Sequence, residues 1–470
     1  MMPSPSQARF AAEILPELSA LLGERIVTSH AVREQHSHGE GMPDSVLPDA
    51  VAFALTTEEV AAIAAICNRT STPLIPFGAG SSLEGHVVPL YGGVALDLSG
   101  MTRIVEINAD SMDCRVEAGV TKEQLNEELR ASGLFFPVDP GAHATLGGMA
   151  ATRASGTNAV RYGTMRDVTL GLTVVTPDGR IIRTGGRARK SSAGLDLTRL
   201  YVGSEGTLGI ITEVALRLSG IPESITSAIC QFPDLESAVA TVIAALQIGI
   251  DVARIELSDD MQMRACIRYS KLEGLDELPT LFFEFHGTPA VVAEQVETMQ
   301  ALASENGGEG FKFANRPEER SRLWTARHNA YFANIAMMPG HKLLGTDACV
   351  PISKLAACIE ATQRDIAESG LVAPLVGHVG DGNFHLGILF DPEKADQRRA
   401  AEALASRVSL RAIEHGGTCT GEHGIGIGKM GYMETEHGPA LDVMRAIKAA
   451  LDPNGIMNPG KMLPEARKEH

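Results

Sequence analysis

The sequence predicts an α+β protein with two main domains. Its 470 residues are too many for one ordinary hydrophobic core. From Pro48 onward, short strand patterns alternate with helical patterns, which is typical of α/β units. After Pro222 the glycine density falls, and two strand–helix–strand units in succession predict an antiparallel sheet with helices on one face. We therefore expect an N-terminal helical segment, a first domain, a second domain and a C-terminal segment, at residues 1–45, 46–222, 223–415 and 416–470.

The N-terminal part begins with one helical pattern, at residues 7–22. A polar stretch with His36 and His38 follows. A His-x-His pair can bind a metal, but we expect solvent around this one because glycine and proline border it. The first α/β unit then comprises a strand at 51–55, a capping box in Thr56-Thr57-Glu58-Glu59 before a helix to Cys67, and a strand at 73–76.

A glycine-rich loop follows that strand, from Pro76 to His86. Its small residues let the backbone approach a ligand, and its consecutive N–H groups with two serine hydroxyls can form a nest for phosphate oxygens. The loop is not the usual dinucleotide fingerprint, because Leu83 stands where a third glycine is required.

Two further glycine-rich segments lie at residues 139–163 and 203–211. A nearly bare backbone of this length is costly to order without a ligand. Three such segments at similar separations predict a large planar ligand with a diphosphate, held along its length. Three unrelated loops are the alternative.

The second half of the chain shows the two strand–helix–strand units. We expect strands at 224–232, 251–257, 281–286 and 310–314, with helices at 235–247 and 291–303. A helix around the only tryptophan, Trp324, would place Arg327 and Tyr331 on one face. Together with Lys342 in the next strand, Arg327 could bind a carboxylate. The alternative is a solvated helix face on which Arg327 pairs with Glu318 or Glu319.

Two histidines, His378 and His385, flank a Gly-Asp-Gly-Asn cluster. This spacing suits two short strands joined by a tight turn, so that both imidazoles could point at one ion. Glu422 comes later in a Gly-Glu-His-Gly tetrad, and two histidines with one glutamate are a common ligand set for a catalytic metal. His423 is then left beside the metal as a base. The alternative is that the histidines fill a core.

Composition argues against several classes of protein, namely nucleic-acid-binding, secreted and membrane-spanning ones. The net charge of -17 argues against nucleic acid as a partner. Seven scattered cysteines, never in a Cys-x-x-Cys pair, read as reduced residues of a cytosolic protein. We expect neither a membrane span nor a secretory signal, so a cytoplasmic location is the default, with peripheral membrane contact left open.

These motifs, in order, and the C-terminal Asn458-Pro459-Gly460-Lys461 resemble the FAD-dependent D-2-hydroxyacid dehydrogenases of the vanillyl-alcohol-oxidase superfamily. That family includes D-lactate dehydrogenase (cytochrome), the glycolate oxidase FAD subunit and D-2-hydroxyglutarate dehydrogenase. The resemblance implies a PCMH-type (p-cresol methylhydroxylase-type) FAD-binding domain of two α/β subdomains. It also implies a ferredoxin-like antiparallel-sheet domain that caps the substrate, and a C-terminal helical return to the FAD domain.

The resemblance also assigns residues to FAD. Residues 76–86 would hold the diphosphate, and the other two glycine-rich segments and the C-terminal motif would line the remainder. The implied cofactor-binding residues are Pro76, Gly78, Ala79, Gly80, Ser81, Ser82, Gly85, His86, Pro140, Gly141, Thr145, Gly147, Gly148, Ala151, Ser155, Gly156, Tyr162, Gly163, Glu205, Gly206, Gly209, Ile210, Ile211 and Asn458. Some relatives attach FAD through a histidine near this loop, but non-covalent FAD is expected here.

The implied reaction is oxidation of a D-2-hydroxy acid. His378, His385 and Glu422 would hold Zn²⁺ or Mn²⁺ against the substrate, and His423 would take the hydroxyl proton as hydride passes to flavin N5. Residues matching Arg327, Tyr331 and Lys342 contact the substrate's acid groups in the family. An external acceptor (a cytochrome, a quinone or an electron-transfer flavoprotein) would take the electrons.

The sequence leaves the substrate and the assembly open, a homodimer included. The 2-hydroxyglutarate enzymes carry an asparagine where this chain has Gly387, a departure that favours D-lactate. D-2-hydroxyglutarate dehydrogenase and a glycolate oxidase subunit are the alternatives within the family. A metal-free flavoprotein oxidase and a non-redox zinc protein are the competing classes.

Overall fold

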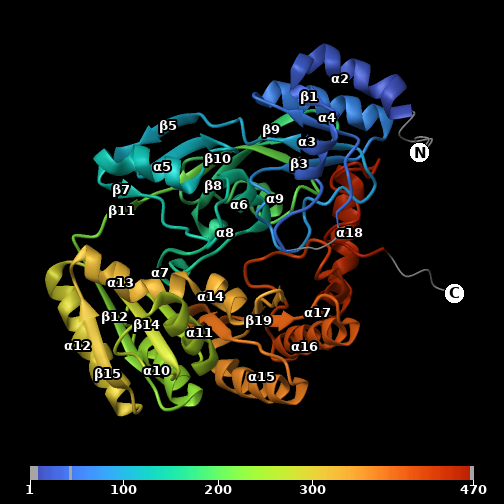
Figure 1. The fold of residues 1–470 in the computed structure, drawn as a ribbon. Coiled ribbons are helices and arrows are strands. Elements are labelled where there is room, and N and C mark those ends of the chain that lie inside the picture. The colour runs from blue at the N-terminus through green and yellow to red at the C-terminus, as the bar shows by residue number, and fades with distance from the viewer. Residues whose placement is uncertain (1–8, 42–44, 466–470) are drawn as a thin grey trace. The chain divides into compact units, whose positions relative to one another are not determined.

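The computed structural model describes residues 9–41 and 45–465, which divide into two compact units (Figure 1). The first unit comprises the described residues of Met1–Ser155, Thr164–Ile221 and Glu422–His470. The second comprises Gly156–Gly163 and Pro222–Gly421. The chain therefore re-enters the first unit six residues after the expected position 416. The short segment Gly156–Gly163 groups with the second unit, which the sequence did not predict.

The first unit contains a mostly parallel sheet in the order β1-β2-β4-β3. Strands β2 and β3 both run parallel to β4, and α4 connects them. The predicted N-cap is confirmed, because the Thr56 hydroxyl accepts the Glu59 N–H at 3.2 Å. The elements of this layer are η1 (Phe10–Ile14), α2 (Leu15–Leu22), η2 (Gly23–Arg25), β1 (Ile26–Val27), α3 (His30–Gln35), β2 (Ala50–Phe53), α4 (Thr57–Thr70), β3 (Leu74–Phe77) and β4 (Val94–Asp97).

The expectation of a solvated His-x-His pair is wrong for His36. His38 is exposed, but His36 is buried, and its Nε2 lies 2.9 Å from the Asp97 carboxylate on β4. Its ring packs 4.5 Å from the ring of Phe77. A buried carboxylate across the sheet, invisible in the local sequence, accounts for the difference.

A five-stranded antiparallel sheet, β5-β6-β10-β8-β9, forms the second layer of this unit. Its core side chains alternate along the strands, as Val214 and Leu216 do on β10. The elements are β5 (Ile104–Asn108), η3 (Ala109–Ser111), β6 (Asp113–Glu117), α5 (Lys122–Leu129), η4 (Arg130–Ser132), β7 (Leu134–Phe135), α6 (Leu146–Thr152), α8 (Met165–Val168), β8 (Thr169–Val175), β9 (Ile181–Gly185), α9 (Leu197–Tyr201), β10 (Ile210–Arg217), β11 (Ser219–Gly220), η7 (Met430–Tyr432), α17 (Met433–His437) and α18 (Ala440–Leu451).

The second unit is built on one large sheet, in the order β15-β12-β14-β13-β18-β19-β16, with β17 also paired to β19. Its first four strands have the order 4-1-3-2 in chain sequence, which is the ferredoxin-like arrangement. The strands are β12 (Ser224–Gln231), β13 (Val252–Ser258), β14 (Thr280–Gly287), β15 (Glu309–Ala314), β16 (Lys342–Gly345), β17 (Ala348–Cys349), β18 (Leu375–His378) and β19 (Asn383–Phe390).

Helices cover both faces of this sheet, so the expectation of helices on one face is wrong. On β14, Phe283 packs in the main core, whereas Phe282 packs with Met263 and Trp324 on the opposite face. A strand buried on both faces carries apolar residues in succession, and the run Leu281-Phe282-Phe283 on β14 was the available signal of a second helical layer. The helices are α7 (Ala159–Tyr162), α10 (Leu235–Gln247), α11 (Asp260–Ser270), α12 (Pro289–Glu305), α13 (Pro317–His328), α14 (Ala330–Met337), η5 (Ile352–Lys354), α15 (Leu355–Ser369), η6 (Val379–Asp381) and α16 (Ala395–Glu414).

Within the part of the chain that the structure describes, no helix combines the length and the apolar character needed to cross a bilayer.

Candidate active site

The three glycine-rich segments converge in the first unit. A Cβ on Gly78 would lie 2.5 Å from the Thr145 hydroxyl, and a Cβ on Gly206 would lie 3.0 Å from the Pro76 ring. The Glu205 N–H donates to the Ala151 carbonyl at 2.8 Å. The first segment therefore contacts the other two at positions where a larger side chain would not fit.

Buried polar atoms in the first loop fit a diphosphate ligand. Ser82 Oγ is buried and has no hydrogen-bond partner among the described residues. Gly80 and Gly85 adopt positive φ angles of 71° and 75°, as a nest of backbone N–H groups requires. The residues present therefore fit FAD.

Glu205 joins this loop to the C-terminal segment. Its carboxylate accepts the N–H groups of Ile425 and Gly426 at 2.7 and 2.8 Å, and lies 3.3 Å from His86 Nε2. Burial alone would raise the pKa of the Glu205 carboxyl, but the charge of His86 and the hydrogen bonds lower it on balance. Asn458 donates to the carbonyls of His86 and Glu205, so the C-terminal motif does return to the cofactor loops.

Several predicted cofactor residues also have other contacts in the structure, and their contact with FAD stays a prediction. Ile210 and Ile211 are buried in two hydrophobic cores. Tyr162 belongs to the segment that groups with the second unit, where its hydroxyl lies 2.7 Å from His286 Nδ1. Gly156 and Gly163 bound that segment.

The predicted histidine hairpin is present. Strands β18 and β19 pair antiparallel, and Gly382 in the connection has a φ of 77°. The rings of His378 and His385 lie 5.3 Å apart between centroids, nearly perpendicular.

Each ring is fixed through Nδ1. His378 Nδ1 lies 2.8 Å from the Glu256 carboxylate, and His385 Nδ1 lies 3.0 Å from the Thr346 carbonyl. A carbonyl or an ionised carboxylate only accepts, so each Nδ1 carries the proton, and in the neutral ring the lone pair is on Nε2. Metal-binding histidines are commonly oriented in this way by the acceptor at their other nitrogen.

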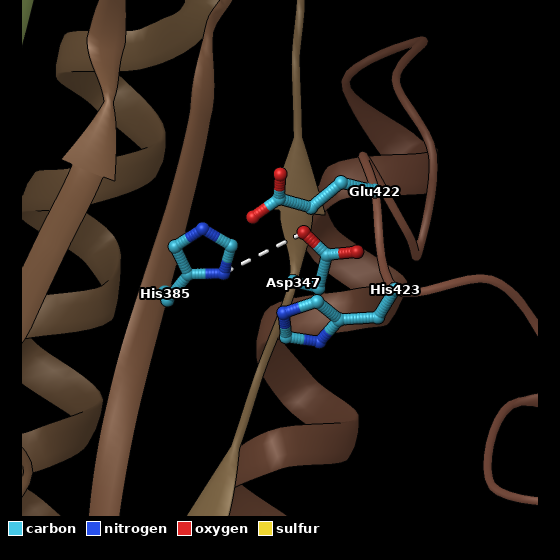
Figure 2. A group of neighbouring side chains, drawn as sticks. All are labelled: Asp347, His385, Glu422 and His423. Atoms are coloured by element: carbon cyan, nitrogen blue, oxygen red, sulfur yellow. Dashed lines mark ion pairs between the residues drawn. The ribbon is translucent and has the colours of Figure 1, made fainter. Parts of the chain in front are cut away.

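Figure 2 shows four side chains that point toward one another: Asp347, His385, Glu422 and His423. One ligand atom from each lies within 4.8 Å of the others. Three of the four were predicted from the sequence, and Asp347 was not. His378 is not in this group. Asp347 is fully buried, and its carboxylate accepts hydrogen bonds from Asn383 and Thr420 at 2.9 and 2.6 Å.

Arg327 pairs with Glu256, not with Glu318 or Glu319. Its Nε and Nη2 both lie 2.9 Å from Glu256 Oε2. Burial alone would raise the pKa of the Glu256 carboxyl, but His378 and Arg327 lower it on balance. One buried carboxylate thus holds a predicted metal ligand and the predicted carboxylate anchor.

Tyr331 does not share a helix with Arg327, contrary to the expectation. Helix α13 ends at His328 and α14 begins at Ala330, with Asn329 between them at ψ of 2°. Tyr331 is 55% exposed. Lys342 is also exposed and opens β16 opposite Phe390, roughly 16 Å along an extended chain from Asp347. Contact of Lys342 with the substrate stays a prediction.

His423 has an acidic neighbour in the first unit. Its Nδ1 lies 3.6 Å from Glu84 Oε1, and Lys429 Nζ lies 2.9 Å from the same oxygen. Burial alone would raise the pKa of the Glu84 carboxyl, but Lys429 and His423 lower it on balance.

Sequence reasoning missed Glu84, Glu256 and Asp347. Glu84 stands inside the first glycine-rich loop, where an acid is unexpected beside a proposed phosphate site. Glu256 is an acid within the apolar strand β13, and Asp347 follows directly on the predicted strand that begins at Lys342. In each case a buried acid in an apolar or glycine-rich context was the available signal.

Comparison with known proteins defines the class. Residues 48–185 match the family described as "FAD binding domain", and residues 221–462 match "FAD linked oxidases, C-terminal domain". A 4-ethylphenol oxidase from Gulosibacter chungangensis has a similar fold, with a TM-score of 0.80 at 21% identity over 97% of both chains. p-Cresol methylhydroxylase has a similar fold too, with a TM-score of 0.76 at 17% sequence identity over 97% of both chains. The protein is thus an FAD-linked oxidoreductase with a PCMH-type fold.

Sequence relatives narrow this class. A probable mitochondrial D-lactate dehydrogenase of Danio rerio is 49% identical, over 94% of this chain and 89% of that protein. The mitochondrial D-lactate dehydrogenase [cytochrome] of Arabidopsis thaliana is 46% identical, over 96% of this chain and 80% of that protein. The glycolate oxidase subunit GlcD of Bacillus subtilis is 34% identical over 95% of each. The chain belongs to the FAD-dependent D-2-hydroxyacid dehydrogenase family, as its motifs predicted.

Proposed function

We propose that this enzyme oxidises D-lactate to the 2-oxo acid with FAD and a divalent metal ion. The observation that carries the metal proposal is the orientation of two histidines. His378 and His385 each present Nδ1 to a fixed acceptor, and their rings lie 5.3 Å apart. We propose Nε2 of both rings as ligands of one ion, with Glu422 as the third ligand. His385 and Glu422 belong to the cluster in Figure 2, whereas His378 is outside it and joins them only in this proposal. Asp347 adds a buried carboxylate beside His385.

The chemistry of a 2-hydroxy acid explains why such a site is needed. Its hydroxyl is a weak acid at neutral pH, so oxidation requires help in removing that proton. When bound, FAD would accept the hydride from the α-carbon, and a Zn²⁺ or Mn²⁺ ion would act as a Lewis acid toward the substrate. His423 is our candidate for the base, with the Glu84 carboxylate 3.6 Å behind its Nδ1.

Arg327 is our candidate for the anchor of the substrate carboxylate. The Glu256 carboxylate occupies the edge of the Arg327 guanidinium formed by Nε and Nη2. A substrate carboxylate would therefore bind at the other edge, formed by Nη1 and Nη2. Contacts with Arg327 and with the metal ion would hold the substrate at two points. One face of its α-carbon would then be turned toward the flavin, which selects one enantiomer. Tyr331, which lies beyond Asn329 on α14, stays a predicted substrate contact. Lys342, at the exposed start of β16, stays a second predicted contact of the substrate carboxylate.

The surroundings of Gly387 support a small substrate. A Cβ on this residue would lie 2.9 Å from Asn334 Nδ2 and 3.1 Å from the Leu343 side chain. The larger residue of the 2-hydroxyglutarate enzymes would therefore need Asn334 to move. Relatives named D-lactate dehydrogenase agree with this preference.

A glycolate oxidase subunit is the second candidate, because the Bacillus subtilis relative with that name matches almost the whole chain. For the electron acceptor we propose a cytochrome, as in the name of the Arabidopsis thaliana relative, with a quinone or an electron-transfer flavoprotein as alternatives. A cytoplasmic location stays our prediction, although several relatives are named mitochondrial.

Flavin bleaching tests the substrate directly. Purified protein is mixed anaerobically with D-lactate, L-lactate, glycolate, D-2-hydroxyglutarate or D-malate, and the visible flavin absorption is followed. We expect D-lactate to reduce the flavin fastest and L-lactate to be inert. Faster reduction by glycolate or D-2-hydroxyglutarate would replace the D-lactate proposal, and bleaching by none of the five would contradict the reaction class.

A further inference from the structure

The second unit contains a buried carboxylate that is not itself a proposed metal ligand, base or substrate anchor. Glu256 lies on β13 and is 1% exposed. Its neighbours Ile255 and Leu257 point into the main core, so Glu256 points to the opposite face of the sheet. A carboxylate at such a position is costly unless charged or hydrogen-bonding partners surround it.

Glu256 has two partners, one for each oxygen. Oε1 lies 2.8 Å from His378 Nδ1, and Oε2 lies 2.9 Å from both Nε and Nη2 of Arg327. The three residues come from three elements, β13, β18 and α13. The carboxylate therefore bridges His378 and Arg327.

We infer that Glu256 is a positioning residue that couples the metal ligand His378 to the substrate anchor Arg327. The inference rests on the proposed function. Through His378, the carboxylate fixes the tautomer that places a lone pair on Nε2, and it makes the imidazole a stronger ligand. Through Arg327, it fixes the guanidinium plane and sets which edge meets the substrate.

The ion pair between Glu256 and Arg327 also changes the local charge near the proposed metal site. A guanidinium is always charged, and one placed near a divalent cation would weaken cation binding. The Glu256 carboxylate neutralises Arg327 locally, so that a metal and a cationic anchor can occupy neighbouring positions. Removing this carboxylate should therefore affect metal affinity and substrate affinity together.

The test uses Glu256→Gln in the FAD-loaded enzyme, with Glu284→Gln as the matched control. Glu284 is also buried on this sheet and also contacts a histidine and an arginine, His286 and Arg254, but neither is a proposed ligand. Zn²⁺ and Mn²⁺ affinities of the chelator-treated proteins are measured by calorimetric titration. KM and kcat for D-lactate are then measured at saturating metal, with FAD content and melting temperature as checks on folding.

We expect Glu256→Gln to weaken metal binding by about 10- to 100-fold. At saturating metal, its KM for D-lactate should stay raised by about tenfold or more, while kcat changes less. Glu256→Asp, which keeps the charge with a shorter side chain, should lie between Glu256→Gln and wild type, and it serves as the test variant if Glu256→Gln does not fold. Glu284→Gln should keep wild-type metal affinity even if its melting temperature falls.

Three outcomes would overturn the inference, and each identifies a different failure. Wild-type protein that binds metal, together with a folded Glu256→Gln variant of equal metal affinity, would overturn this inference alone. A wild-type protein that binds neither ion would overturn it together with the metal part of the proposed function. An equal loss of metal affinity in Glu284→Gln would show a general effect of destabilising the sheet, and would also overturn the positioning role.

Discussion

His378 and Glu256 lie 122 positions apart in the sequence, yet their side chains meet at 2.8 Å. The same carboxylate holds Arg327. One carboxylate on β13 thus contacts both the proposed metal ligand on β18 and the proposed carboxylate anchor on α13. It also separates two effects that mutations of the site should show, one on metal binding and one on substrate binding.

Arg327→Met should raise KM for D-lactate without weakening metal binding. Loss of a charge-assisted pair costs about 1.5–3 kcal/mol, which corresponds to a KM increase of roughly 10- to 150-fold. Metal affinity should stay the same or increase, because a positive charge is removed. Arg322→Met, an exposed residue of the same helix, is the control and should behave as wild type. An unchanged KM in Arg327→Met would exclude Arg327 as the anchor.

His423→Asn should keep FAD and metal bound but slow flavin reduction by D-lactate. A positioned general base contributes about 10²- to 10⁴-fold, so a loss of at least two orders of magnitude is expected. Stopped-flow absorption under anaerobic conditions measures the rate. His415→Asn, at the exposed end of α16, should reduce normally. Near-normal reduction in His423→Asn would remove this residue from the mechanism.

Glu284 should make the second unit sensitive to acid. Burial alone would raise the pKa of its carboxyl, but the hydrogen bond with His286 and the charge of Arg254 lower it from 4.5 to about 2. Because the folded state releases this proton more readily than the unfolded state, its stabilising effect is complete well above pH 4.5. The effect is lost as the pH falls from 4.5 toward 2.

Fluorescence of Trp324, the only tryptophan, reports the stability of this unit. Between pH 6 and pH 3.5, protonation of Glu284 alone should reduce the free energy of unfolding by roughly 1 kcal/mol. Urea titrations at the two pH values should show that loss in wild type and in Glu318→Gln, which changes an exposed acid. Glu284→Gln should lack it. Equal pH dependence in all three proteins would refute the role of Glu284.

The sequence predicted those parts of the fold that depend on local pattern. Helix α10 begins and ends where its pattern predicted, and Thr56 caps α4 as its motif indicated. The histidine hairpin was predictable because its turn needs glycine at a positive φ, and Gly382 provides it. Glycine-rich loops likewise predicted a cofactor domain, since an ordered bare backbone indicates a ligand.

Pairings between distant segments were not predictable in the same way. Glu256, Glu84 and Asp347 acquire their roles only when strands or loops far apart in the chain come together. The break at Asn329 was also hidden, because the residues on either side favour a helix and one residue at ψ of 2° redirects it. The expectation that His36 is solvated was wrong because its buried partner, Asp97, lies 61 positions away in the sequence.

Metal removal tests the central claim most directly. The purified enzyme is treated with EDTA, freed of chelator, and mixed anaerobically with D-lactate before and after addition of Zn²⁺ or Mn²⁺, while the flavin absorption is recorded. We expect the metal-free protein to retain its FAD yet fail to bleach, and the added ion to restore bleaching. Full-rate bleaching by metal-free protein would contradict a catalytic role for His378, His385 and Glu422 as metal ligands.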